Sequence, residues 1–196
     1  DFALCETFEG DNFGQDPTVA FAGEDQAAKA DVMIVMDTSG SMSGDKIDSA
    51  KSGAKTLVDT LGPGVNVGLV EFDSAASRVI GLTSAHDDVK TAIGGLAADG
   101  LTDIGAGIDR AQTEIDNNGR DVPTFMVVLG NGDTSGGETP ATNAKNKGTT
   151  IYGIAYGSGA STSDFENIVG EVPNDSDWLD FAFDADQDDI TTIFEN

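Results

Sequence analysis

The amino-acid sequence predicts an α/β domain with a Rossmann-like, open and mostly parallel six-stranded sheet, one antiparallel edge strand, and helices on both faces. From residue 31 onward, strand-like and helix-like segments alternate, which is typical of a parallel sheet covered by helices. Two uninterrupted apolar runs, 32–36 and 125–129, have the length of strands buried on both faces. A third observation is the short gap between the strand-like segments 65–72 and 77–82, which indicates a hairpin and hence an antiparallel edge strand.

The predicted strands follow from apolar content and from the turn residues that bound them. Residues 32–37 and 124–130 contain the two continuous apolar runs, so we expect them to form the central pair of the sheet. The full set of predicted strands is 32–37, 65–72, 77–82, 124–130, 149–156 and 178–183.

Between these strands, apolar residues recur at helical spacing. The first such stretch ends at Gly62-Pro63, and the third ends at the turn Asn117-Asn118-Gly119. The apolar positions of the first three helices are Ile47, Ala50, Ala54, Leu57, Val58 and Leu61; then Val89, Ala92, Ile93 and Leu96; then Ile104, Ile108, Ala111 and Ile115. Further helices are predicted at 141–147, 163–169 and 188–194.

Residues 1–30 form a polar lead-in segment, and residues 31–196 form the predicted domain. The chain begins with Asp1 rather than Met and lacks the features of a secretion signal, so we expect a piece of a longer protein. No apolar stretch reaches the length needed to cross a bilayer. The one cysteine, Cys5, excludes an internal disulfide and a cysteine-based zinc site, and is either a buried or free thiol or half of a bridge to another segment.

The charge balance is strongly acidic, with 35 Asp and Glu against 10 Lys and Arg and a net charge of −25. A negative field of this size repels nucleic acid and anionic lipid, so neither is an expected partner. It suits concentrated salt, which screens the self-repulsion, and we therefore expect a salt-adapted source. High net charge can also indicate disorder, but the regular apolar segments argue against that interpretation.

The segment directly after the first predicted strand carries the most informative chemistry. Asp37, Ser39 and Ser41 lie on a tight turn that Gly40 permits, at the carboxyl end of a central strand, where open α/β sheets bind ligands. One carboxylate and two hydroxyls supply oxygen ligands for a hard cation such as Mg²⁺ and leave coordination positions open. The same Asp and Ser side chains could instead cap the following helix.

The Asp-x-Ser-x-Ser pattern of residues 37–41 resembles the metal-ion-dependent adhesion site (MIDAS) of von Willebrand factor type A (vWA) and integrin I-like domains. Residues 68–72 resemble the second strand of that family, and residues 100–108 resemble the loop and helix start that supply its next ligand. The resemblance implies the vWA fold and places Thr102 at the metal, although Thr102 could also be a plain helix N-cap. Residues 127–132 fall where the family has a strand that ends in Thr-Asp-Gly.

The chain departs from the family pattern at Asn131, which stands where the family has Asp and follows Gly130 rather than Thr. An Asn oxygen can ligate directly or through water but adds no charge, so we expect weaker metal binding. Asn131 could equally be an ordinary turn residue beside Gly132 instead of a metal ligand. Asp103 and Asp133 are nearby carboxylates that could compensate for the lost charge without contacting the metal directly, through hydrogen bonds to its ligands.

Two further residues, Met42 and Ser43, border the predicted site and are candidates for partner contact or simple loop residues. The acidic residues at positions 184, 186, 188 and 195 have the spacing of a calcium-binding loop, but the segment has no glycine where the loop needs one. A simpler interpretation is that these residues cap the last predicted helix. His86 has no nucleophile pattern beside it, so a hydrolase triad is unsupported, and no catalytic residue is predicted.

The resemblance implies a domain that binds a partner protein or glycan through Mg²⁺, with Mn²⁺ or Ca²⁺ as other possible ions, outside the cell or on a surface assembly. The sequence shows no general base with a partner near the predicted metal site, so we do not expect an enzyme. The partner would offer a carboxylate or polar oxygen to the metal. Two other interpretations stay open. One is a structural subunit of a filament, capsid or surface lattice, and the other is a chelatase-like intracellular partner of an ATPase.

Overall fold

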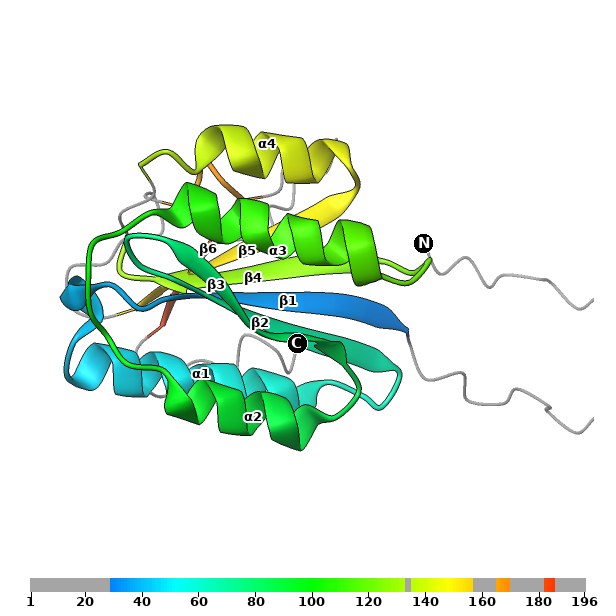
Figure 1. Ribbon diagram of the computed structural model, residues 1–196, viewed down its shortest axis with the longest axis horizontal. Coiled ribbons are helices and arrows are strands. Elements are labelled where there is room, and N and C mark those ends of the chain that lie inside the picture. Colours follow the sequence, from blue (N-terminus) through cyan, green and yellow to red (C-terminus); the bar gives the residue numbers. More distant parts are fainter. Residues whose placement is uncertain (1–28, 133–134, 157–164, 170–181, 186–196) are drawn as a thin grey trace, which may run out of the picture.

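The computed structural model describes residues 29–132, 135–156 and 165–169 and the backbone of residues 182–185. A mixed sheet lies between two layers of helices, with strand order β3-β2-β1-β4-β5-β6. Figure 1 shows α1 and α2 on one face of this sheet and α3 and α4 on the other. The elements are β1 (Ala30–Asp37), a 3₁₀ helix η1 (Gly40–Met42), α1 (Asp45–Thr60), β2 (Val65–Phe72), β3 (Ala76–Thr83), α2 (His86–Gly95), α3 (Ile104–Asn118), β4 (Thr124–Gly130), α4 (Glu138–Asn146), β5 (Thr149–Tyr156) and β6 (Ala182–Ala185).

The strand pairing confirms the predicted α/β fold with one antiparallel pair. β1 pairs in parallel with β2 on one side and with β4 on the other, so the two continuous apolar runs form the centre of the sheet. β2 and β3 form the antiparallel hairpin, with a register irregularity between Val67 and Val70.

The predictions are less accurate toward the C-terminus. The last predicted strand, 178–183, is not matched, because β6 spans Ala182–Ala185 and residues 178–181 lie outside the described residues. Of the helix predicted at 163–169, the described residues 165–169 form turns, and the helix predicted at 188–194 lies outside the described part of the chain.

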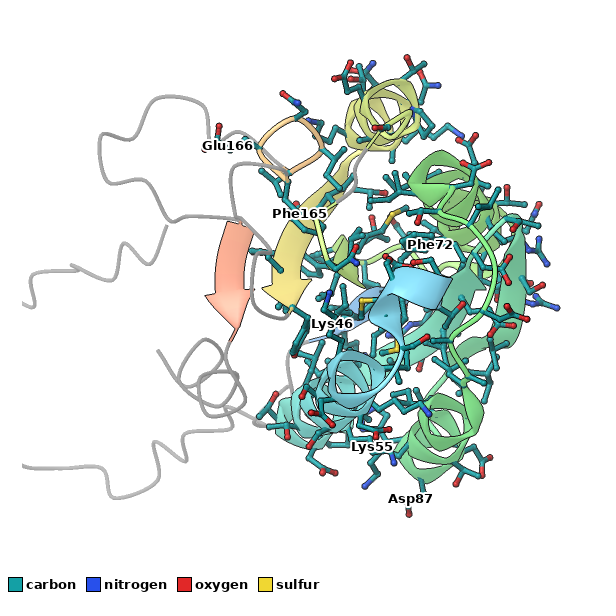
Figure 2. All side chains as sticks on the ribbon, turned by 90° about the vertical axis from the view of Figure 1, so that its left-hand side faces the viewer. Lys46, Lys55, Phe72, Asp87, Phe165 and Glu166 are labelled. Atoms are coloured by element: carbon teal, nitrogen blue, oxygen red, sulfur yellow. The ribbon has the colours of Figure 1, made fainter. Side chains whose placement is uncertain are left out.

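Each face of the sheet has its own apolar core. In β1, Ile34 and Met36 pack with α1 and α2, while Met33 and Val35 pack with α3 and α4. This alternation explains why residues 32–36 of β1 are all apolar: both faces of the strand are covered there. Figure 2 looks onto the end of the sheet that lies to the left in Figure 1, and the labelled Phe72 belongs to the core beneath α3.

A glycine lets α3 lie close to the sheet. A Cβ atom at Gly107 would stand 2.7 Å from Cδ1 of Phe72, which is too near for any real side chain.

None of the helices in the described part of the chain combines the length and the apolar character that are needed to span a bilayer.

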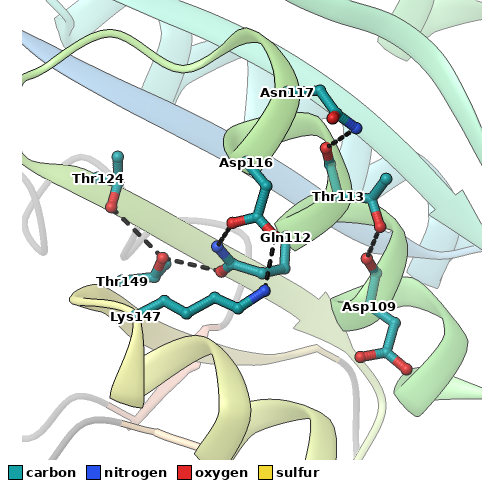
Figure 3. A network of polar contacts seen from close by, with 8 residues as sticks. All are labelled: Asp109, Gln112, Thr113, Asp116, Asn117, Thr124, Lys147 and Thr149. Carbon is teal, nitrogen blue, oxygen red and sulfur yellow. Dashed lines mark hydrogen bonds and ion pairs between the residues drawn. The ribbon is translucent and has the colours of Figure 1, made fainter.

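A polar network joins α3 to α4 and β5 (Figure 3). Gln112 of α3 accepts a hydrogen bond from the Thr149 hydroxyl at 2.9 Å and donates one to Asp116 at 2.8 Å. Lys147, at the end of α4, donates to the other oxygen of Asp116 at 2.6 Å. The Lys147 hydrogen bond, followed by that of Gln112, lowers the pKa of Asp116. The buried Gln112 amide is thus satisfied at both ends, which makes this network a structural link between the two helices.

Glu114 of α3 holds the edge strand β3 in a similar way. Its carboxylate accepts hydrogen bonds from the Arg78 guanidinium, from the Leu82 backbone N–H at 3.2 Å, and from the Asn118 amide at 3.1 Å. Burial alone would raise the pKa of Glu114, but these donors favour the charged form and leave its pKa below the usual value.

The amino end of the sheet is closed by a buried ion pair. Asp31, which is fully buried, accepts hydrogen bonds from the Arg120 side chain at 2.7 Å and from the Arg120 backbone N–H at 2.6 Å. The same guanidinium donates to the backbone oxygens of Ala30 and Gly64. One side chain therefore ties the connection between α3 and β4 to the start of β1 and to the turn before β2.

We expect the substitution Arg120→Met to lower the free energy of unfolding by on the order of 3 kcal/mol, because it leaves the buried Asp31 carboxylate without its cation. Urea denaturation of the native chain and the variant measures this loss. Lys147→Met is the matched control, since its ion pair with Asp116 lies at the surface and its loss should cost much less. Equal losses in the two variants would contradict a special role for Arg120.

Candidate metal site

The site begins at Asp37, the last residue of β1. The Asp37 side chain is only 1% exposed, and its Oδ1 accepts a hydrogen bond from the Ser39 backbone N–H at 2.8 Å. The Ser39 and Ser41 hydroxyl oxygens lie 2.8 Å apart and share a hydrogen bond. Ser39 is buried, whereas Ser41 is exposed. The turn thus brings one buried carboxylate and two hydroxyls together, as the sequence pattern predicts.

Thr38, between these residues, fastens the turn to the neighbouring strand. Its backbone N–H and its hydroxyl both donate to the Phe72 carbonyl at the end of β2, at 2.8 and 3.1 Å. Its own carbonyl accepts from the Asp99 N–H at 2.8 Å. The turn after β1 is therefore held between the end of β2 and the connection that leads to α3.

That connection carries Thr102 to the same end of the sheet. The Gly40 N–H donates to the Gly100 carbonyl at 3.0 Å, and the Leu101 N–H donates to the Ser74 hydroxyl at 2.9 Å. Gly100 has a φ of +79°, and a Cβ there would lie 2.9 Å from Ser74 Oγ, so both the backbone and the space require glycine. Thr102, two residues beyond the Gly40 contact, is half-buried.

The end of β4 completes the edge. A Cβ atom at Gly130 would lie 3.2 Å from Asp37 Cβ and 3.3 Å from Asp37 Oδ2, so the strand ends directly beside the carboxylate. The glycine leaves room there that the Thr of the family pattern would occupy. Asn131 follows at once and is half-buried. The fold thus places Asp37, Ser39, Ser41, Thr102 and Asn131 on connections that meet at one end of the sheet, while their role as ligands remains a prediction.

The structure decides the capping alternatives. Gly44 is the N-cap of α1, with no side-chain cap, so neither Ser39 nor Ser41 has that role. Asp103 caps α3, and its Oδ1 accepts from the Ala106 N–H at 3.0 Å, so Thr102 is not the N-cap. Asp103 was predicted only as a carboxylate that compensates for the missing charge, and the capping contact shows that it also stabilises the start of α3. Asp133, the other residue of that prediction, lies outside the described residues.

Met42 was wrongly predicted as a candidate for partner contact. Its side chain is 0% exposed and belongs to the core beneath α1, because the 3₁₀ helix η1 turns it inward. Ser43 is exposed, and its hydroxyl donates to the Gly40 carbonyl at 2.7 Å, so it stays available at the surface while it stabilises the turn.

Sequence reasoning missed the supporting residues of the hairpin between β2 and β3. Asp73 accepts a hydrogen bond from the Ala75 N–H at 3.0 Å, and Ser74 holds the Leu101 backbone. Burial, together with the charge of Asp73, raises the pKa of Glu71 nearby. The available signal was topological: a strand parallel to the first brings its following turn to the same end of the sheet.

The donor set fits a hard divalent cation. Within the described residues, no three His, Cys, Asp or Glu side chains gather as a metal site, so a site of soft or purely acidic ligands has no support there. The edge at Asp37 offers instead one buried carboxylate, hydroxyl oxygens and an amide oxygen. These are the neutral and anionic oxygen ligands that Mg²⁺ and Mn²⁺ accept.

Two other predictions fall largely outside this site. The calcium-like acidic positions lie outside the described residues except for Asp184, whose backbone is in β6. His86 lies at the start of α2, where its Nε2 is 2.9 Å from the Val65 carbonyl oxygen, a contact that serves the packing of α2 on β2.

Comparisons with known proteins agree with this architecture. A UPF0353 protein of Mycolicibacterium gilvum is 27% identical over 188 residues, which cover 83% of this chain and 56% of that protein. The chain therefore spans about half the length of the curated relatives it matches. Proximal thread matrix protein 1 from the mussel byssus superposes with a TM-score of 0.72 and 26% identity, over 86% of this chain and 45% of that one. The von Willebrand factor domain of the pili tip protein Mfa5 from Porphyromonas gingivalis superposes with a TM-score of 0.72 at 14% identity, over 87% of this chain and 94% of that one, and so supports the fold alone.

The family model of the von Willebrand factor type A domain matches residues 31–196, which is the whole predicted domain. With the sheet order and the turn at Asp37 described above, this match shows that the chain belongs to the von Willebrand factor type A domain family.

Proposed function

We propose that this domain binds a partner protein or glycan through a divalent cation held at the carboxyl end of β1. One observation carries the proposal: the buried Asp37 carboxylate and the paired Ser39 and Ser41 hydroxyls lie where three connections of the chain meet. Proteins use this end of an open α/β sheet for ligands. vWA domains generally mediate protein interactions, and the finer assignment to metal-dependent recognition is ours.

The residues that would hold the ion are Asp37, Ser39, Ser41, Thr102 and Asn131. A bound cation would supply a positive centre with an open position for a carboxylate or polar oxygen of the partner. Asp37 would contribute the one full negative charge of this set, and the hydrogen bond from the Ser39 N–H fixes one of its oxygens. Because Asn131 is neutral, the ligands cancel less of the ion's charge, which favours an acidic partner group but weakens retention of the ion.

The ion is proposed to be Mg²⁺, with Mn²⁺ or Ca²⁺ as other possible occupants. A structure of the mussel byssus protein, 26% identical to this chain, has a zinc-occupied MIDAS motif. This likeness supports a divalent ion at the corresponding edge here, and the hydroxyl and amide donors favour a hard ion over zinc.

We propose an extracellular or cell-surface location in a salt-adapted organism. The byssus protein is a thread matrix protein, and a second structure of similar fold, with TM-score 0.60 and 25% identity, is an aerotolerance-related membrane protein of Bacteroides fragilis. The net charge of −25 favours the salt-adapted source.

Two other functions remain as alternatives. In a structural subunit of a filament, capsid or lattice, the ion would only stiffen the three connections at the sheet edge. In a chelatase-like partner of an ATPase, the same edge would bind another protein inside the cell. Catalysis is not proposed, because the described residues at this edge offer no general base paired with a second titratable group that positions it.

We expect calorimetry to show uptake of one Mg²⁺ or Mn²⁺ by the native chain. Asp37→Asn should remove the binding heat, because it removes the charge that holds the ion, and Asn131→Asp should raise the affinity about tenfold by adding a carboxylate. Asp59→Asn, the same change on exposed α1, is the control and should leave binding unchanged. The proposal fails if the native chain takes up neither ion while Asn131→Asp does.

We expect a glycan and peptide binding screen at high salt to give ligands that bind with Mg²⁺ and are released by EDTA, because the partner oxygen needs the cation. The elution profile on a sizing column, measured before and after EDTA, separates the alternatives. Recognition predicts loss of ligand with the particle size unchanged, whereas a structural role for the ion predicts that an assembly dissociates. Ligands that stay bound in EDTA would count against metal-dependent recognition.

We expect thermal unfolding to move to higher temperature when KCl is raised from 0.1 to 2 M, because the screening length falls from about 10 Å to below about 3 Å. Equal shifts in sucrose would indicate solvent exclusion rather than charge screening. A variant with Asp59→Asn, Asp109→Asn and Asp121→Asn, all exposed, should show a weaker dependence on KCl. A melting temperature that does not rise with KCl would contradict salt adaptation.

A further inference from the structure

Leu101 is an apolar side chain held in solvent at the edge of the candidate site. It is 75% exposed, and among the described residues the other exposed large apolar side chain is Val79, at 39%. A single exposed leucine is ordinary on a protein surface, so its exposure alone indicates no function. The fixed backbone around Leu101 and its position beside the candidate site are what indicate a role in binding.

The backbone around Leu101 is fixed on both sides. Its own N–H donates to the Ser74 hydroxyl, and the Gly100 carbonyl accepts from Gly40 of the turn after β1. Gly100 has no space for a side chain beside Asp73 and Ser74. The leucine is therefore presented by an anchored connection, which reduces the entropy lost when a partner covers it.

Leu101 also lies directly before Thr102, at the end of the sheet where the metal is proposed. In Figure 1, the connection from α2 to α3 passes the end of the sheet where η1 lies. Exposed carboxylates flank it in sequence, at Asp99 and Asp103. The surface beside the candidate ion thus combines a fixed aliphatic side chain with a negatively charged border.

We propose that Leu101 is the apolar anchor of the recognition surface, and that the partner is a protein segment with an aliphatic side chain beside a basic residue, near the oxygen that meets the ion. The aliphatic group would pack on Leu101, and the basic group would face Asp99 and Asp103. An apolar contact within a polar rim is the usual arrangement at the core of a protein interface. This inference rests on the proposed function and selects protein over glycan as the partner class.

A peptide set tests this proposal. Each peptide contains one Glu, whose carboxylate supplies the oxygen for the metal. The next residue is either Leu or Ser, and the one after it is either Lys or Gln. Binding is measured with Mg²⁺ at 0.15 M KCl to the native chain, to Leu101→Ala and to Val79→Ala, the matched control on the edge strand β3. Calorimetry with Mg²⁺ alone is run on each protein, so that metal binding and peptide binding are measured separately.

We expect the Glu-Leu-Lys peptides to bind best, and Leu101→Ala to weaken them about tenfold with Mg²⁺ uptake unchanged. Val79→Ala should have no effect. In a double-mutant cycle, replacing the peptide Leu by Ser should cost affinity for the native chain but little for Leu101→Ala, because the two side chains contact each other.

The outcomes separate this inference from the proposed function. If Mg²⁺ and the peptides bind but Leu101→Ala has no effect, the anchor role is wrong and metal-dependent recognition stands. If the native chain takes up no metal while peptide binding depends on Leu101, the metal proposal is wrong and the anchor stands. Binding of glycans with no peptide bound, or preference for Gln over Lys in the peptides, would overturn the partner class.

Discussion

The candidate site depends on a small set of backbone hydrogen bonds that tie the turn after β1 to two neighbouring connections. Thr38 bonds to the end of β2 and to Asp99, and Gly40 bonds to Gly100. None of these contacts uses a proposed ligand atom, so the turn is held whether or not an ion is present. The side chains of Asp37 and Ser39 are therefore positioned in advance, which lowers the ordering cost of any ligand at this edge.

Glycine is what allows these connections to approach each other. Gly100 adopts a positive φ beside Ser74. Gly130 ends β4 so close to Asp37 that a Cβ atom at Gly130 would lie 3.2 Å from the Asp37 Cβ. The chain departs from the family's Thr-Asp-Gly pattern at this second point, where Gly130 and Asn131 replace Thr and Asp. The replacement gives the Asp37 carboxylate more space and less neighbouring negative charge, so in the proposed site Asp37 would be the principal source of negative charge for a cation. A site built in this way gains sensitivity to the partner's own oxygen, because the protein ligands neutralise less of the ion.

Most of the sheet could be predicted from the sequence because β1 and β4 are covered on both faces and therefore contain the continuous apolar runs 32–36 and 125–129. β2, β4 and β5 match their predicted bounds, and the short gap before β3 correctly indicated the hairpin. The sequence failed where tertiary contact decides orientation. Nothing in the local pattern shows that η1 turns Met42 into the core. The cap of α3 is a different case, because Asp103 directly precedes Ile104 and Asp is a stronger N-cap residue than Thr, so the local pattern favours Asp103 over Thr102. The parallel pairing of β1 and β2 places the turn that carries Ser74 at this end of the sheet, but the contact of Ser74 with the Leu101 backbone, 27 residues away, could not be predicted.

The acidic surface and the exposed Leu101 are related through the screening of charge. At low salt, a net charge of −25 gives a long-range field that attracts any cationic partner, whatever its shape. In concentrated salt the screening length falls to about 3 Å, and attraction between separated charges is largely lost. Contacts that act at short range then decide which partner is bound. A bond to a fixed cation and the burial of an aliphatic side chain are both of this kind, and salts that are excluded from the protein surface strengthen apolar burial. The proposed recognition surface, with one apolar side chain beside the candidate metal site, would therefore keep its selectivity in concentrated salt.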